Sequence, residues 1–157
     1  MFIELFLIIT LSIGIVLFIL TLLLHLIIVK IFKRNSLLLV RLILVLLILQ
    51  FLLGMAANLF QTIPYIKPWL VFHDFGYILF HTINATLLII LSIMYLIQVR
   101  KEKTQRFHGI IGLTGIVIAY IGGVIFVDFG QNNIFSFIMA VGFIVSTFVY
   151  SYQSFNN

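Results

Sequence analysis

The chain has 157 residues, of which 64% are hydrophobic and only 8% are charged. Soluble globular domains carry about 25% charged residues, so this composition excludes an ordinary water-soluble domain and indicates a protein whose apolar surface faces lipid. The formal net charge is +5, and there is no cysteine. Disulfides, thiolate metal sites and the usual iron-sulfur clusters are therefore excluded as well.

Five long apolar segments follow one another along the chain. A helix needs about 20 mostly apolar residues to cross a hydrocarbon layer of roughly 30 Å, and these segments reach or approach that length. None of them shows the short alternation of a β-barrel strand. The sequence therefore predicts an all-α, polytopic integral membrane protein with a single transmembrane domain and spans at Phe2–Val29, Leu38–Phe60, Val71–Val99, Ile110–Val127 and Ile134–Tyr150.

The first apolar segment differs from the other four. It is almost uniformly Leu and Ile, begins without a basic region, and is much longer than the apolar part of a signal peptide. We expect it to remain as a peripheral span, while spans two to five form an up-down four-helix bundle. The turn between the last two spans, residues 128–133, contains Asp and Asn suited to capping the fifth helix.

Eight of the nine Lys and Arg residues fall in two short patches, at residues 30–41 and 100–106. Because basic residues in short loops are retained in the cytoplasm, both patches are predicted to be cytoplasmic. This places the N-terminus outside the cell membrane and the C-terminus in the cytoplasm. Both patches could also touch anionic lipid headgroups. The basic residues lie beside membrane spans and form no binding module, so nucleic acid is not an expected partner.

Polar residues inside the apolar spans form two matching stripes at helical spacing. The second span carries Gln50, Gly54, Asn58 and Gln61, and the third carries Tyr77, His81, Asn84, Ser92 and Tyr95. Polar groups in a span normally point into the bundle, because exposing them to lipid is costly. Gln50 and Asn84 lie at similar depth, with His81 between the levels of Asn58 and Gln50. We therefore predict a buried polar constellation of Gln50, Asn58, His81 and Asn84, which in its simplest interpretation joins helices by hydrogen bonds.

The histidines offer a second interpretation, because neutral imidazole is the usual axial ligand of b-type haem. His25 and His108 both lie near the predicted cytoplasmic face, so their depth in the membrane is similar enough for them to be a pair of haem ligands on the inner side. His81 has no histidine on another span at its level, and Met55 nearby is more typical of packing. The sequence thus leaves open a haem site that uses His81, with His25 and His108 as a possible inner pair, beside the interpretation in which all three are structural.

Other chemical motifs are missing from the sequence. It contains no His-Glu-x-x-His zinc motif, no Gly-x-Ser-x-Gly elbow and no phosphate-binding loop, so no catalytic residue and no metal site are predicted. His73 and Asp74 are more typical of a helix cap than of an acid-base pair. The fourth span carries small residues at helical spacing, which predicts close packing inside the bundle or at a seam between two copies, and could also admit a flat macrocycle: Gly109, Gly112, Gly115, Ala119, Gly122 and Gly123.

Several segments resemble a group of small, uncharacterised multi-span membrane proteins: NLFQTIP at residues 58–64, FVDFG at residues 126–130 and SFIMA at residues 136–140. The resemblance leaves out the first span and implies no activity. The His81 helix is also faintly similar to haem-binding four-helix membrane bundles. The chain lacks the paired histidines on facing helices of one such group and the Glu-x-x-x-His-Arg motif of another, so no haem-synthase activity is carried over.

These observations predict a small integral membrane protein that acts as a non-catalytic accessory or structural subunit of a membrane assembly. Its expected partners are the lipid bilayer and a membrane protein or second copy reached through the glycine face of the fourth span. The alternative, from a different class, is a b-type haem or quinone-binding electron-transfer subunit that uses His81.

Overall fold

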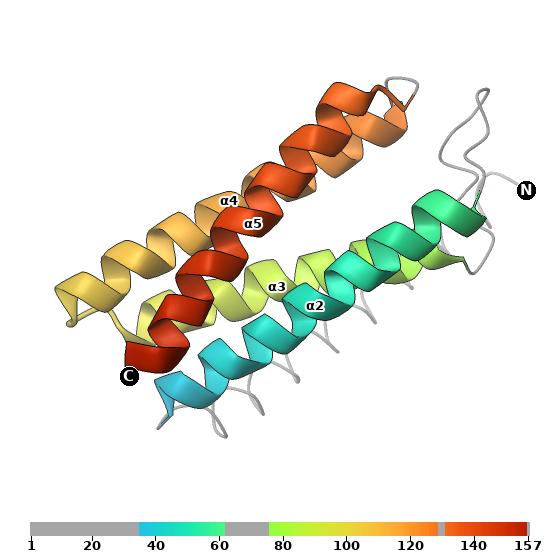
Figure 1. Cartoon of the computed structure of the whole chain (residues 1–157). Coiled ribbons are helices and arrows are strands. Elements are labelled where there is room, and N and C mark those ends of the chain that lie inside the picture. Colours follow the sequence, from blue (N-terminus) through green and yellow to red (C-terminus); the bar gives the residue numbers. More distant parts are fainter. Residues whose placement is uncertain (1–34, 62–75, 129–130, 157) are drawn as a thin grey trace, which may run out of the picture. The chain divides into compact units, whose positions relative to one another are not determined.

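The structure, a computed structural model, describes residues 35–61, 76–128 and 131–156, which form four helices (Figure 1). They are α2 (Ser36–Phe60), α3 (Tyr77–Gln98), α4 (Lys103–Asp128) and α5 (Asn133–Asn156). All regular secondary structure in these ranges is helical, as predicted. Each of the four helices is long and apolar enough to cross a membrane. The first predicted span lies outside the described residues, so the structure supports four of the five predicted spans.

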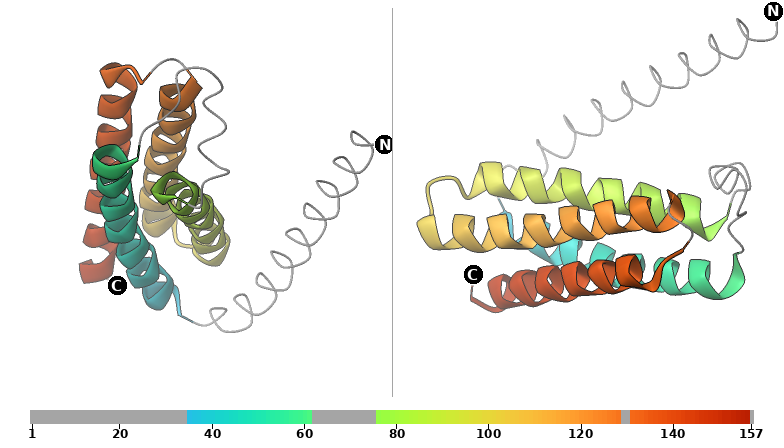
Figure 2. Two further views of the ribbon diagram at one scale, coloured as in Figure 1. Left: turned by 90° about the vertical axis from the view of Figure 1, so that its right-hand side faces the viewer. Right: turned by 90° about the horizontal axis from the view of Figure 1, so that it is seen from above.

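Successive helices run in alternating directions and pack as an up-down bundle (Figure 2). The most extensive pairing is between α4 and α5, followed by that between α2 and α3. The two pairs are joined because α2 also packs on α5 and α3 packs on α4. Phe51 of α2 stacks on Phe143 of α5 with ring centroids 5.4 Å apart, which fixes one of the contacts between the pairs.

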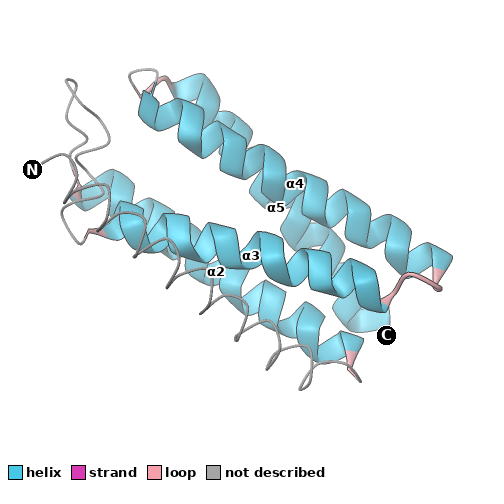
Figure 3. Cartoon of the chain, turned by 180° about the vertical axis from the view of Figure 1, so that it is seen from behind, coloured by secondary structure: helices cyan, strands magenta, loops and turns pink. Residues whose placement is uncertain are grey.

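The core is concentrated towards the end of the bundle that holds the α3–α4 turn. Its fully buried side chains come from the first half of α2, the second half of α3 and the second half of α5: Leu39, Val40, Ile43, Leu88, Leu91, Tyr95 and Tyr150. Figure 3 shows the α2–α3 pair and the α4–α5 pair diverging towards the opposite end. Large apolar side chains such as Phe60 and Phe137 are exposed there.

Two helices extend beyond the predicted spans. α4 begins at Lys103, seven residues before the apolar run, because Lys, Gln and Arg are good helix formers and continue the helix into polar sequence. α5 continues past Tyr150 to Asn156, where the Gln153 side chain donates to the Gln105 carbonyl oxygen at 2.8 Å and ties the end of α5 to the start of α4. The length of the apolar run in the sequence does not predict either of these two extensions.

The α4–α5 turn confirms the expected cap. The side-chain oxygen of Asn132 accepts a hydrogen bond from the Ile134 N–H at 2.9 Å, which satisfies one of the free donors at the start of α5. The preceding residue, Gln131, has a φ of 62°, in the left-handed region. The capping prediction for this turn therefore holds at Asn132.

Candidate functional site

The interface between α2 and α3 contains a connected polar cluster, the Gln50–His81–Asn84 cluster. The Asn84 side-chain nitrogen donates to the Leu46 carbonyl oxygen at 3.0 Å and to Gln50 Oε1 at 2.7 Å. Gln50 Nε2 lies 3.0 Å from His81 Nε2, and His81 Nδ1 lies 3.2 Å from the Gln50 carbonyl oxygen. Asn84 is buried, and Gln50 and His81 are half-buried. The structure thus brings Gln50 and Asn84 together, as their similar depth predicts.

Two backbone carbonyls fix the direction of every hydrogen bond in this cluster. A carbonyl oxygen can only accept, so the Leu46 oxygen requires the amide nitrogen of Asn84 to face α2. That nitrogen also meets Gln50 Oε1, which turns the Gln50 amide nitrogen towards His81. The Gln50 carbonyl oxygen in turn requires a proton on His81 Nδ1. His81 is therefore the neutral tautomer, with Nδ1 donating and Nε2 accepting.

Gly54 makes room for the His81 ring. A Cβ atom at this position would lie 3.4 Å from His81 Nδ1 and 3.0 Å from Cε1, and the second distance is tighter than ordinary van der Waals contact. The absence of a side chain on α2 thus lets the imidazole approach the helix and reach the Gln50 carbonyl. The spacing of four residues between Gln50 and Gly54 puts both on the same face of α2.

The other polar residues of the α2 stripe have different positions. Asn58 is exposed, two turns beyond Gln50, and takes no part in the hydrogen bonds that join Gln50, His81 and Asn84. Its predicted place in a buried constellation is therefore corrected. Gln61 lies at the end of α2, and its Oε1 accepts from the Ile78 N–H at 2.8 Å, at the start of α3. This bond supplies a side-chain acceptor for a free donor of the α3 N-terminus.

The described histidines do not come together. His108 lies near the start of α4, where its Nδ1 donates to the Thr104 carbonyl oxygen at 2.9 Å and its ring packs against Tyr152 with centroids 5.1 Å apart. His25 lies outside the described residues, as do His73 and Asp74. Both nitrogens of His81 have hydrogen-bond partners, so in this arrangement neither is available to a haem iron. Met55 is exposed. Among the described residues, no group of three His, Asp or Glu side chains could hold a metal ion.

The glycine face of α4 packs inside the bundle. A Cβ atom on Gly112 would lie 2.7 Å from the Tyr150 ring, and Gly115 and Gly142 face each other so closely that a Cβ on either would meet the backbone of the other. Ser146 Oγ lies 2.9 Å from the Gly112 carbonyl oxygen and 2.8 Å from that of Gly142, and its hydroxyl donates to them. These small residues therefore serve the α4–α5 contact.

A second polar group lies between α3 and α5, and sequence reasoning identified only its α3 side, Ser92 and Tyr95. Tyr95 and Tyr150 pack edge to face with centroids 6.0 Å apart, and the buried Tyr150 hydroxyl lies beside the buried Ser92 hydroxyl. The signal was present on α5, where Ser146, Tyr150 and Gln153 recur at four and three residues. It was hidden because Ser and Tyr are common in apolar helices, whereas amides and histidine are rare there.

Searches with this chain find no matching family model, no matching curated protein and no matching solved structure. The resemblance to small multi-span membrane proteins therefore stays a prediction.

Proposed function

We propose that this chain is a non-catalytic accessory or structural subunit of a membrane assembly. The observation that carries the proposal is the Gln50–His81–Asn84 cluster, in which the imidazole and both amides are engaged in hydrogen bonds between α2 and α3. A catalytic or ligand-binding imidazole needs a nitrogen that can reach its substrate or metal. Buried Asn84 and Ser146 join neighbouring helices by hydrogen bonds, and the outer faces of the helices present apolar side chains to lipid or to a partner protein.

The proposal includes an orientation. We place the α3–α4 turn and the C-terminus in the cytoplasm, with the first predicted span as a fifth crossing that puts the N-terminus outside. Arg100, Lys101 and Lys103 support this orientation through the retention of basic residues in the cytoplasm. Because the chain has no cysteine, single cysteines at Lys101 and Asn133 can be labelled in intact cells with an impermeant maleimide. Labelling at Asn133 alone supports the orientation, and labelling at Lys101 alone contradicts it.

The accessory role is tested by the size and composition of the complex in native membranes. The tagged chain is cross-linked in membranes of its source organism and separated by native electrophoresis, together with a Gly142→Leu variant designed to disturb the α4–α5 contact. The proposal expects one larger species with a defined stoichiometry, which is lost in the variant. Migration of the cross-linked native chain only at its own mass would contradict the proposed role.

The haem alternative requires a different state of His81. A haem iron at Nε2 would have to replace the Gln50 amide that now occupies this nitrogen at 3.0 Å. The discriminating measurement is the absorption spectrum of the purified, detergent-solubilised protein expressed with ample haem. A Soret band that disappears in His81→Ala would favour the haem-binding role over the accessory one. A colourless protein that retains its helices would favour the accessory role.

A further inference from the structure

One end of the described bundle is strongly basic. Arg41 lies near the start of α2, Arg100 and Lys101 lie in the α3–α4 turn, and Lys103 and Arg106 lie in the first turn of α4; all five residues are exposed. Glu102 is the one acidic residue that the structure describes at this end, so the local net charge is +4. We call the five basic residues the basic rim. The rim draws on three separate elements of the bundle.

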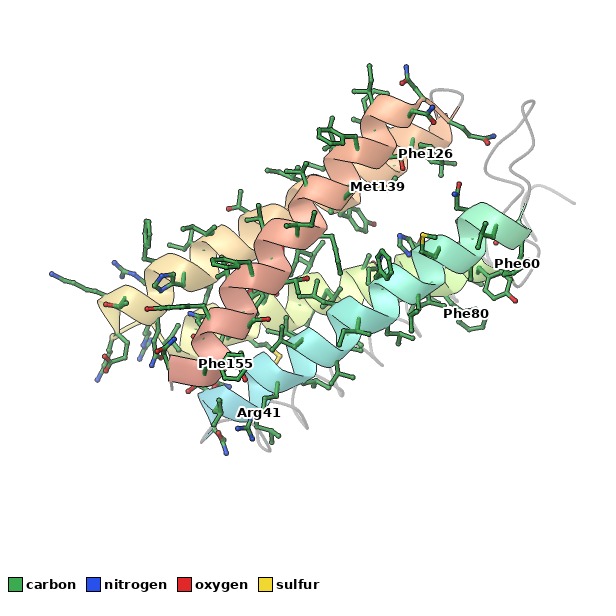
Figure 4. The ribbon with its side chains drawn as sticks, viewed as in Figure 1. Arg41, Phe60, Phe80, Phe126, Met139 and Phe155 are labelled. Carbon is green, nitrogen blue, oxygen red and sulfur yellow. The ribbon has the colours of Figure 1, made fainter. Side chains whose placement is uncertain are left out.

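Exposed aromatic side chains accompany the basic rim. Phe107 is 62% exposed next to Arg106, and Phe155 is 87% exposed near the end of α5. Figure 4 shows Phe155 and Arg41 at the same end of the bundle. Phe rings beside Lys and Arg are suited to a membrane surface, because the rings can insert at the boundary with the acyl chains while the charges remain in water.

The first turn of α4 places positively charged side chains at the positive end of the helix dipole. The N-terminus of a helix carries a partial positive charge, and acidic residues usually lie in its first turn. In α4 this turn contains no acidic residue and instead holds Lys103 and Arg106. Glu102, directly before Lys103, offsets only part of this positive charge, and phosphate groups nearby would relieve the remaining repulsion.

We propose that the basic rim binds the headgroups of anionic phospholipids, with the Phe107 and Phe155 rings inserted at the boundary between headgroups and acyl chains. The phosphates neutralise charge on α2, the α3–α4 turn and the start of α4 together, and so hold the two helix pairs at one level of the membrane. This inference rests on the membrane-spanning helices and does not depend on the accessory role.

The test measures lipid selectivity of the full chain in detergent. Equal amounts of phosphatidylglycerol and phosphatidylcholine are added, and the retained lipids are counted by native mass spectrometry. Each Lys or Arg near an anionic surface strengthens binding about fivefold. The native protein should prefer phosphatidylglycerol, and the combined variant Arg100→Gln, Lys101→Gln, Lys103→Gln, Arg106→Gln should lose at least about tenfold of that preference. Circular dichroism checks that the variant is folded.

Two single variants keep the test decisive if the combined variant does not fold. Arg41→Gln should reduce the preference up to about fivefold, because α2 contributes to the same surface. Glu102→Gln removes a negative charge from the same end of the bundle, so it should keep or increase the preference for phosphatidylglycerol. Equal retention of both lipids by the native protein would overturn the proposal. So would an unchanged preference in the combined variant or in Arg41→Gln, or complete displacement of phosphatidylglycerol by inorganic phosphate.

Discussion

Replacing Asn84 with Ala should destabilise the α2–α3 pair by about 1 to 2 kcal/mol. The substitution removes the hydrogen bonds to the Leu46 carbonyl and to Gln50 Oε1. Interhelical hydrogen bonds in membranes contribute about 0.6 kcal/mol each on average, so the two together give about 1.2 kcal/mol. Gln50 is only half-buried, so leaving its Oε1 without this donor adds less than the cost of about 1 to 3 kcal/mol for a fully buried acceptor, and the total stays within about 2 kcal/mol.

The measurement is reversible unfolding in mixed micelles, with SDS as denaturant and circular dichroism as the readout. Thr86→Ala is the matched control, because its hydroxyl is on the same helix but donates only to the Thr82 carbonyl of that helix, and it is exposed. A double-mutant cycle with Gln50→Ala should give a coupling free energy of about 0.5 kcal/mol or more. If Asn84→Ala matches Thr86→Ala, or if the cycle is additive, the reasoning about the Gln50–His81–Asn84 cluster is refuted.

Three further predictions test single contacts, by the same unfolding assay except where another measurement is named. Gly142→Ala should weaken the α4–α5 contact, because the added Cβ would meet the Gly115 carbonyl oxygen and lie 3.0 Å from Ala119. The control Gly123→Ala should be tolerated, because its Cβ would meet only the flexible Met139 sulfur, at 3.3 Å. Equal losses of stability in the two variants would contradict the packing described for Gly142. His81→Gln should retain the fold in a thermal-shift experiment, since an amide can also donate and accept hydrogen bonds. His81→Leu should unfold at a lower temperature, because it can do neither. Similar melting temperatures of the two variants would show that the hydrogen bonds between His81 and Gln50 contribute nothing to stability. Tyr150→Phe should lower the free energy of unfolding by no more than about 1 kcal/mol, because it keeps the ring and removes only the contact of its hydroxyl with Ser92; a much larger loss would contradict this reading of the contact.

The sequence predicted the helices well and the polar contacts in part. Runs of apolar residues mark a span because burial in lipid requires them, and this signal located α2 to within a few residues. It missed the polar extensions of α4 and α5, and α3 begins at Tyr77, after Gly76, where the prediction had Val71. The depth of Gln50 and Asn84 could be counted from the span boundaries, since a helix rises by about 1.5 Å per residue. Their meeting was therefore predictable.

The remaining contacts depend on helix rotation, which depth does not specify. Asn58 follows Gln50 at helical spacing, yet it is exposed, near the end of α2 where the α2–α3 and α4–α5 pairs diverge. Likewise, the bond from Gln153 to Gln105 joins residues 48 positions apart in polar segments that no apolar pattern marks. Such pairings follow from how the helices pack and cannot be read from either helix alone.

The mutual satisfaction of Gln50, His81 and Asn84 has a consequence for how the chain enters the membrane. Either helix inserted by itself would carry unpaired amide or imidazole groups into hydrocarbon, where no water is present to solvate them. Delivered as a hairpin, the same two helices conceal these groups from lipid at the moment of entry. Biogenesis should therefore release α2 and α3 laterally as a single unit, onto which the α4–α5 hairpin then docks.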